Sequence, residues 1–174
     1  MTLDPETIRK AIRRTEQFQA WVLEKTKELL TELAEIGVDG ATVRFGQAEY
    51  DGTNDVEVNW EELEDNLVAV IATAKLNEYN TALFIEFGTG VKYPDDHPEK
   101  PAGLLGRGKF GLGRGSNPKG WEYIGEPGTH GKQASKTRPN LIRTLGNKAN
   151  MPMYKTVREL EERFEEIARR VFND

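Results

Sequence analysis

The sequence predicts an α+β domain with a long N-terminal helix, a small antiparallel β-meander, a long Gly/Pro-rich loop and a C-terminal helix. Two observations predict this order. Apolar residues recur at helical spacing near both ends of the chain, and between these ends they alternate as they do in strands. The length of 174 residues fits one domain, residues 1–174, within which residues 91–140 form a loop insertion.

The first helix is predicted to begin at Asp4-Pro5, an N-cap residue followed by proline, and to end at Gly37 as a C-cap. A helix of this length reaches on the order of 45 Å, which is longer than a compact domain of this size requires. Its apolar stripe is therefore expected to extend onto a neighbouring subunit, unless the helix breaks near Thr26 or Glu28. The stripe consists of Ile8, Ile12, Thr15, Phe18, Val22, Leu29, Leu33 and Ile36.

Three strands are predicted to follow as an antiparallel meander. Residues 42–45 and 56–60 alternate between apolar and polar, and Asp51-Gly52 between them is a hairpin turn signal. Residues 67–74 are apolar on both faces, which is typical of a central strand that is covered on both sides.

Residues 79–87 are compatible with a short helix capped by Asn80 or Thr81 and equally with a further strand, and Gly88-Thr89-Gly90 ends either one. Residues 91–140 hold most of the glycines and prolines and have almost no periodicity, so a loop is expected there. A C-terminal helix is predicted from apolar residues that step by four and three. These are Met153, Val157, Leu160, Phe164, Ile167 and Val171.

Ion pairs along the C-terminal helix are expected at i,i+4 with the acid first, which is the favourable order. The expected pairs are Glu159/Arg163, Glu165/Arg169 and Glu166/Arg170.

The composition bounds the possible function classes. The chain has no cysteine, which excludes a disulfide framework, a thiol nucleophile and a cysteine-based zinc site. A net charge of -5 argues against general affinity for nucleic acid. Residues 1–30 lack the apolar core of a signal peptide, and no run approaches the length of a membrane span. A protein that folds in a cytoplasm and makes no membrane contact is expected.

Candidate catalytic residues do not form a coherent site. Gly106–Gly111 spells G-x-G-x-x-G but lacks the strand before it and the helix after it that dinucleotide binding requires. Asp95-Asp96-His97 has no metal-ligand spacing and is most simply a solvated turn. We therefore expect no enzyme activity, cofactor or metal. The remaining candidates for a base or a nucleophile are His130, Ser116 and Ser135.

The predicted loop contains a basic stretch without acidic residues. Such a stretch can dock onto an acidic partner or follow a phosphate backbone, and it is equally compatible with a solvated loop. Its basic residues are Lys100, Arg107, Lys109, Arg114 and Lys119.

Glu86 lies in an apolar run directly before Gly88-Thr89. A buried carboxylate requires hydrogen-bond donors, so Glu86 is expected to face solvent or to accept from nearby N–H groups such as those of the glycine turn. Gly88 or Gly90 is expected at positive φ, where a Cβ is costly.

Two segments carry a resemblance to a known family. Glu86-Phe87-Gly88-Thr89 and Gly146–Tyr154, with the aromatic element Gly120–Tyr123 between them, resemble motifs of the gene-10-like family of lambdoid siphophages. Members are minor tail components, neck proteins or tail-completion proteins. The second motif departs from the family pattern, because Met151 takes the usual proline position and Pro152 falls one position late. This departure affects the predicted start of the last helix more than it affects the resemblance to the family.

The resemblance implies a structural virion protein that forms a homo-oligomeric ring, most plausibly a hexamer, at the head-proximal end of a tail. Its partners would be the tail tube or terminator protein and the head-closure or connector proteins, with DNA in the channel as a second contact. Assembly would take place in the bacterial cytoplasm. The residues it implies as fold-defining are Glu86, Phe87, Gly88, Thr89, Pro152 and Met153.

Two other classes stay open. One is a nucleic-acid-binding module that uses the basic residues of 100–119. The other is a small hydrolase that uses Asp95, Asp96 and His97.

Overall fold

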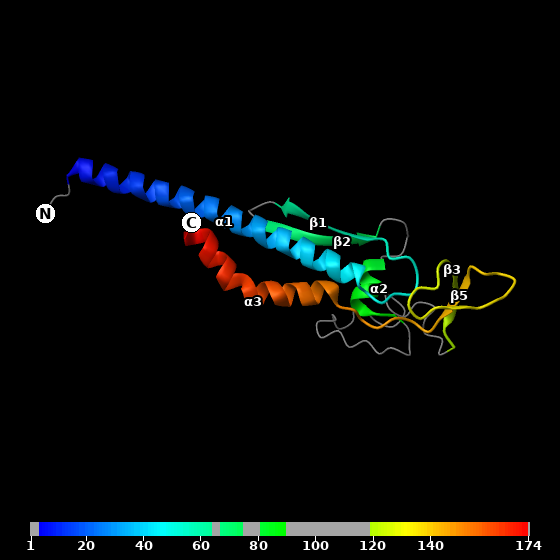
Figure 1. Cartoon of the computed structure of the whole chain (residues 1–174). Helices are drawn as coiled ribbons and strands as arrows, with labels where there is room; N and C mark the ends of the chain where they lie inside the picture. The colour runs from blue at the N-terminus through cyan, green and yellow to red at the C-terminus, as the bar shows by residue number, and fades with distance from the viewer. Residues whose placement is uncertain (1–3, 64–66, 75–80, 90–118, 174) are drawn as a thin grey trace.

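A single helix of 42 residues, α1 (Pro5–Gly46), forms the long axis of the molecule (Figure 1). The structure is a computed structural model that describes residues 4–63, 67–74, 81–89 and 119–173. The helix begins as predicted, because the Asp4 carboxylate accepts the Thr7 N–H at 3.2 Å and Pro5 occupies the first helical turn. The helix extends about 63 Å at the standard rise.

The predicted end of this helix at Gly37 is wrong, and the structure shows a packing reason for the glycine. A Cβ at Gly37 would lie 3.1 Å from Val70 Cγ2 and 3.5 Å from Leu160 Cδ1. Gly37 therefore lets the helix approach a strand and the last helix closely, and it does not end the helix.

The predicted strand at residues 42–45 is also wrong, because these residues continue α1. Phe45 lies on α1, and its side chain is buried in the main hydrophobic core. The helix does not break near Thr26 or Glu28 either. The Thr26 hydroxyl donates to the Val22 carbonyl at 2.8 Å and so is satisfied within the helix.

The meander is thus a hairpin of two antiparallel strands, β1 (Val56–Leu63) and β2 (Leu67–Ala74). Their register runs from Val56 opposite Ala74 to Leu63 opposite Leu67. Asp51-Gly52 precedes β1 and is not the turn of this hairpin, which falls outside the described residues. In the described part of the chain β2 pairs only with β1, so it is not the central strand that its apolar faces predicted.

The ambiguous segment after the hairpin is a helix, α2 (Thr81–Phe87). It contributes Ala82 and Ile85 to the main core, where they meet Ala41 and Phe45 of α1 and Val58 of β1.

A second sheet lies at the end of the molecule opposite the N-terminus (Figure 1). It consists of β3 (Trp121–Ile124), β4 (Lys132–Gln133) and β5 (Leu141–Thr144) in the antiparallel order β3-β5-β4. Two of these strands lie in residues 91–140, so the expected loop insertion holds regular structure in its described part. Residues 90–118 of that insertion lie outside the described residues.

The chain ends with the predicted helix, α3 (Pro152–Asn173), which packs along α1. Its Ile167 and Val171 form a second core with Leu29 of α1. Of the three expected ion pairs, the structure contains Glu159–Arg163 at 3.2 Å and Glu165–Arg169 at 2.5 Å. The structure pairs Arg170 with Glu32 of α1, which joins the two helices.

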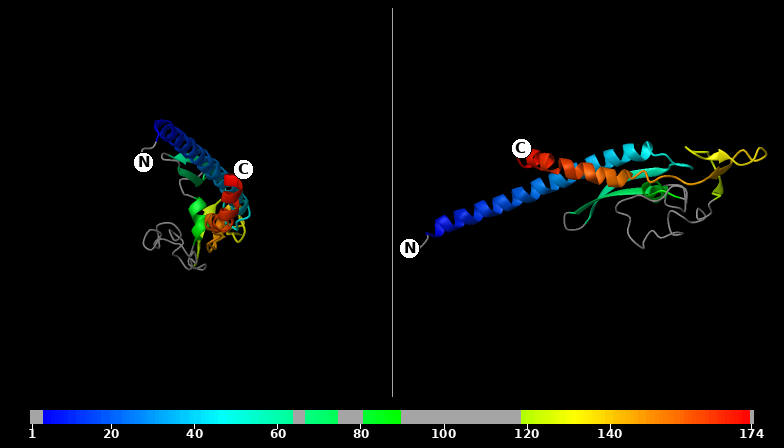
Figure 2. Two further views of the ribbon diagram at one scale, coloured as in Figure 1. Left: turned by 90° about the vertical axis from the view of Figure 1, so that its left-hand side faces the viewer. Right: turned by 90° about the horizontal axis from the view of Figure 1, so that it is seen from below.

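The N-terminal part of α1 projects beyond both α3 and the hairpin (Figures 1 and 2). Every residue from Asp4 to Trp21 is exposed, and Trp21 meets the end of α3 through an edge-on ring contact with Phe172 at 5.8 Å. No helix in the described ranges is both long and apolar enough to cross a membrane.

Candidate functional site

The two segments that carry the family resemblance lie against each other and are joined by backbone hydrogen bonds. The Thr89 N–H donates to the Asn147 carbonyl at 2.8 Å, and the Asn147 N–H donates back to the Thr89 carbonyl at 3.1 Å. The Thr89 hydroxyl oxygen also accepts from the Asn147 backbone and side-chain nitrogens, at 3.0 and 3.2 Å. Both residues are buried, so these bonds are shielded from water.

Gly88 makes this close approach possible. Its φ is 74°, and a Cβ there would lie 2.6 Å from the Ala149 nitrogen and 2.9 Å from the Asn147 carbonyl oxygen. The expectation that Gly88 or Gly90 has positive φ is confirmed at Gly88, while Gly90 lies outside the described residues.

The Glu86 carboxylate caps the last helix. Its two oxygens accept the backbone N–H groups of Met153 at 2.8 Å and Tyr154 at 3.0 Å, in the first turn of α3. These are the orphan donors of a helix N-terminus, which favours a negative charge. The glycine turn after Glu86 was expected to supply donors, whereas these two N–H groups belong to a segment 67 and 68 positions later in the chain.

Met151 and Pro152 determine where α3 begins. Met151 has φ 57°, a conformation uncommon for a residue other than glycine, and its N–H donates to the Glu86 carbonyl at 3.3 Å. Pro152 is then the first residue of α3, where the missing N–H costs nothing. The proline one position late thus marks the helix start, and the Glu86 cap follows directly after it.

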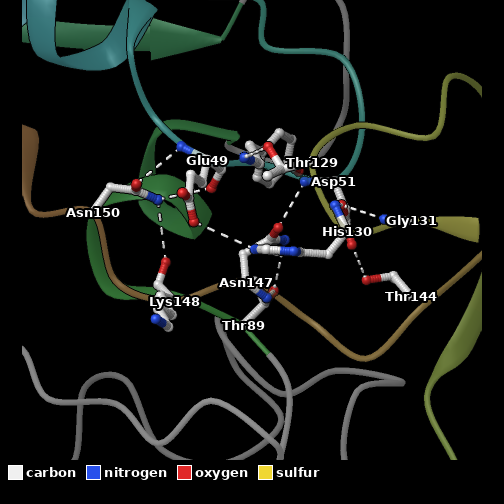
Figure 3. Close-up of polar contacts among 11 residues, drawn as sticks. Glu49, Asp51, Thr89, Thr129, His130, Gly131, Thr144, Asn147, Lys148 and Asn150 are labelled. Carbon is white, nitrogen blue, oxygen red and sulfur yellow. Dashed lines mark hydrogen bonds and ion pairs between the residues drawn. The ribbon is translucent and has the colours of Figure 1, made fainter.

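A second buried carboxylate, Asp51, joins the distal sheet to the helices (Figure 3). Its Oδ1 accepts the N–H groups of His130 at 2.5 Å and Gly131 at 2.7 Å, and its Oδ2 accepts the Thr144 hydroxyl. One side chain thus ties the loop before β4 and the end of β5 to the segment that follows α1. These bonds are charge-assisted and hence stronger than neutral ones.

Two asparagines complete the same network (Figure 3). Asn147 Oδ1 accepts the Asp51 N–H at 2.6 Å. Asn150 pairs with the backbone of Glu49 through both ends of its amide, at 3.0 and 2.9 Å, and also donates to the Lys148 carbonyl at 3.2 Å. We call this network the junction, which comprises residues 49–51, 85–89, 128–131 and 144–154.

Two residues of the junction, Tyr50 and His130, and the neighbouring Tyr123 carry side chains that can titrate. Burial raises the pKa of Tyr50, and it raises the pKa of Tyr123 to about 12, with the Asp51 charge contributing second. Both phenols therefore stay protonated near neutral pH, and the Tyr123 hydroxyl donates a hydrogen bond to the Glu126 carbonyl at 2.6 Å. His130 Nε2 lies 3.3 Å from the Glu49 carboxylate in a partly exposed pair.

The chemistry of the junction is that of a structural clamp. Asp51 directs both oxygens at two backbone N–H groups and a hydroxyl, and Glu86 directs both oxygens at the first turn of a helix. A carboxylate held in this way is positioned by its donors, so its role is to fix the segments that it joins relative to one another.

The structure brings some of the sequence-predicted residues together and leaves others outside its described part. Glu86, Gly88, Thr89, Pro152 and Met153 all belong to the junction. Lys119 is exposed, and its carbonyl accepts two hydrogen bonds from the Arg143 guanidinium, at 3.2 and 2.9 Å. The Ser135 hydroxyl lies 2.9 Å from that of Thr137. The candidates outside the described residues are Asp95, Asp96, His97, Lys100, Arg107, Lys109, Arg114, Ser116 and the glycines of 106–111.

Sequence reasoning missed Asp51, Asn147 and Asn150 as members of one site. Asp51 was interpreted as a turn residue, and the asparagines were noted only as part of a motif. The available signal at Asp51 and Asn147 was a short polar side chain beside glycine, which is common to turns and to buried clamps and so does not separate them. Within the described ranges no three His, Cys, Asp or Glu side chains are placed to hold a metal ion.

Comparisons of the chain with protein-family models, with curated proteins and with solved structures find no match.

Proposed function

We propose that this chain is a structural subunit of a homo-oligomeric ring, a hexamer, at the head-proximal end of a phage or phage-derived tail. The observation that carries the proposal is the N-terminal part of α1, which leaves its own domain with an exposed apolar stripe. Ile8 and Ile12 are 43 % and 52 % exposed on this helix. A lone amphipathic helix in water gains little stability by itself, so this stripe requires a covering surface.

The hairpin supports the same proposal. β2 is apolar on both faces, yet Leu67 is 59 % exposed and the strand pairs only with β1 in the described part of the chain. An apolar strand with an open edge is a template for pairing with another chain. A neighbouring subunit that adds a strand and a covering face would give β2 the central position that its sequence favours.

The placement of the family-like motifs supports the tail-completion assignment. The segments Glu86–Thr89 and Gly146–Tyr154 form the junction that holds the helices and the distal sheet together. Motifs that fix an architecture, and that contain no nucleophile or metal ligand set, are typical of an assembly protein. The partners in this proposal are the tail tube or terminator protein on one side and head-closure or connector proteins on the other, within the virion.

The test is native mass spectrometry of the purified protein over a range of concentrations, with negative-stain imaging of the assembled species. A closed ring of identical subunits supports the proposal. One copy per particle in tails that contain this chain would contradict it.

The distal end of the molecule favours a second candidate, a contact with nucleic acid. Residues 119–148 carry six Lys or Arg against two Glu, although the whole chain has a net charge of -5. Lys132 and Arg143 are exposed and opposite each other on neighbouring strands. Basic residues on one surface can neutralise phosphates, and such binding weakens steeply with salt.

Two measurements separate this candidate from protein docking. Affinity of the isolated protein for duplex DNA that falls with added salt, and that is lost in Lys132→Gln/Arg143→Gln, supports DNA in the channel. Absence of DNA binding at low salt, with a loss of head-to-tail joining when Arg107, Lys109 and Arg114 are neutralised together, supports an acidic protein partner.

A further inference from the structure

The uncovered stripe of α1 continues an interface that already exists within the molecule. Ile8, Thr15, Val22 and Leu29 are spaced by seven residues and so lie on one side of the helix. At Leu29 this side is covered by Ile167 and Val171 of α3. Beyond the end of α3 the same side is open to solvent. We call residues 5–20, which precede the Trp21 contact with α3, the arm.

The arm cannot bury this side against its own domain. The helix is continuous from Pro5 to Gly46, so the direction of the arm is fixed by the core that holds the other half. Figures 1 and 2 show the arm pointing away from α3, the hairpin and the distal sheet. Within the described ranges nothing covers the arm, and we therefore look for the covering surface on another molecule.

The outer side of α3 carries a surface that matches the arm in chemistry. Val157 and Phe164 are 47 % and 49 % exposed and lie seven residues apart, on one side of the helix. Glu161 and Glu165 are exposed beside them, one turn apart. We call these four residues the ridge. Over residues 159–166 the helix has five Glu and a single Arg, so the middle of α3 is strongly acidic.

The arm has the opposite charge at the same spacing. Arg9 and Arg13 lie one turn apart beside Ile8 and Ile12, within residues 9–14 that hold four basic residues and no acid. Neither arginine has an ion pair within the described parts of the chain. Among the described residues Glu161 pairs with Arg158 and Glu165 pairs with Arg169, both on the same helix, and such exposed pairs are weak enough to exchange partners.

We propose that the arm of one copy lies along the ridge of the next copy, with Ile8 and Ile12 against Val157 and Phe164, and with Arg9 and Arg13 facing Glu161 and Glu165. The proposal rests on the ring assembly proposed above and names its contact. Both complementary surfaces belong to this chain, which is why the occupant is a second copy. The contact is heterologous, because arm and ridge are different surfaces, so each copy gives one arm and receives one. Repeated around an axis, such contacts close into a ring.

The first experiment exchanges the charges. Arg9→Glu/Arg13→Glu and Glu161→Arg/Glu165→Arg should each raise the dissociation constant of the assembly about tenfold or more, because like charges then meet. The chain with all four changes should assemble again to within about threefold of the wild type, since the attraction is restored with its sign reversed. Circular dichroism and thermal melting of each variant check that the monomer stays folded, as exposed substitutions predict.

The second experiment uses the absence of native cysteine. A chain with Ile12→Cys and Phe164→Cys should give a ladder of disulfide-linked oligomers on mild oxidation. The matched control is Ile12→Cys with Ile124→Cys, which places the second thiol on the exposed distal sheet and should give no ladder beyond random dimers.

The outcomes distinguish the contact from the ring itself. A ring that forms in every charge variant, with no ladder from the 12/164 pair, overturns the arm-to-ridge contact and leaves the ring proposal standing. A wild-type chain that stays monomeric up to millimolar concentration, and that is present as one copy in assembled particles, overturns both.

Discussion

The Glu86 carboxylate accepts the Met153 N–H at 2.8 Å across 67 positions of sequence, so α2 supplies the cap of α3. Glu86→Ala removes the carboxylate that accepts two partly buried N–H groups of the first turn. We expect a loss of about 2–3 kcal/mol in the free energy of unfolding, from urea titration. The matched control is Glu162→Ala on the exposed side of α3, which should change stability by less than about 0.5 kcal/mol. Equal effects of the two changes would contradict the capping role.

Gly88 should tolerate no side chain. Its φ is 74°, and an added Cβ would lie 2.6 Å from the Ala149 nitrogen, so Gly88→Ala strains the backbone and collides with the facing segment. We expect a loss of at least about 2 kcal/mol, and a drop in soluble yield for Gly88→Val. Gly46→Ala is the control, because a Cβ there meets nothing within 4 Å. That variant should be neutral or up to about 1 kcal/mol more stable, and similar melting of both would refute this interpretation.

Asp51 should hold the distal sheet onto the helices. Asp51→Ala removes the acceptor for two backbone N–H groups and the Thr144 hydroxyl, each worth about 1–3 kcal/mol when left unsatisfied. We expect hydrogen exchange to accelerate in residues 119–146 while α1 and α3 keep their protection. Asp51→Asn keeps one oxygen for the N–H groups and should have a smaller effect. Uniform acceleration throughout the chain would show that Asp51 has no such local role.

Arg44 of α1 forms an ion pair with Glu159 of α3, with Arg44 Nη2 2.5 Å from the carboxylate, and this pair should make stability depend on pH in the acid range. Hydrogen bonds from Arg44 and then Arg163 lower the pKa of Glu159 below its usual 4.5. A carboxyl with a lowered folded-state pKa contributes stability above its unfolded-state pKa and loses it as the pH falls through the folded-state value. The stability difference between wild type and Glu159→Gln should therefore be present near pH 6 and shrink below about pH 4. A difference independent of pH would count against the ion pair.

The Tyr123 phenol should make stability depend on pH in the alkaline range. Burial first, and the Asp51 charge second, raise the pKa of Tyr123 from 10.0 to about 12. The folded state thus favours the neutral phenol, and this stabilisation is complete below pH 10 and lost as the pH rises through about 12. Tyr123→Phe should lower stability near pH 8 by about 1 kcal/mol, because the bond to the Glu126 carbonyl is lost. It should also show a shallower fall of stability above pH 10 than the wild type; equal slopes would contradict the assignment.

The local sequence pattern correctly predicted those helices and strands that are determined by residues close together in the sequence. The steps of four and three from Met153 to Val171 predicted α3, and Asp4-Pro5 predicted the start of α1. The alternation in residues 56–60 predicted β1. In each case the periodicity of the backbone, 3.6 or 2 residues, is expressed by neighbours in the sequence.

The sequence-based predictions were wrong where a residue's role depends on contacts with residues that are distant in the sequence. Gly37 was interpreted as a helix end because glycine commonly ends helices, but here it makes room for Val70 and Leu160. With that end misplaced, Val43 and Phe45 were assigned to a strand. Strand and helix propensities could not reveal this error, because the burial of Phe45 in the core outweighs the local conformational preference of residues 42–45.

The sequence by itself determined the fold class and the two long helices, and it left Glu86 either facing solvent or accepting from N–H groups. Only the tertiary structure decided which donors those are, because Met153 and Tyr154 reach Glu86 through folding and not through chain proximity. The same holds for Asp51, whose partners lie 79 to 93 positions away. Periodicity encodes which side of an element is buried, whereas the partner of a buried polar group is fixed by how the elements pack.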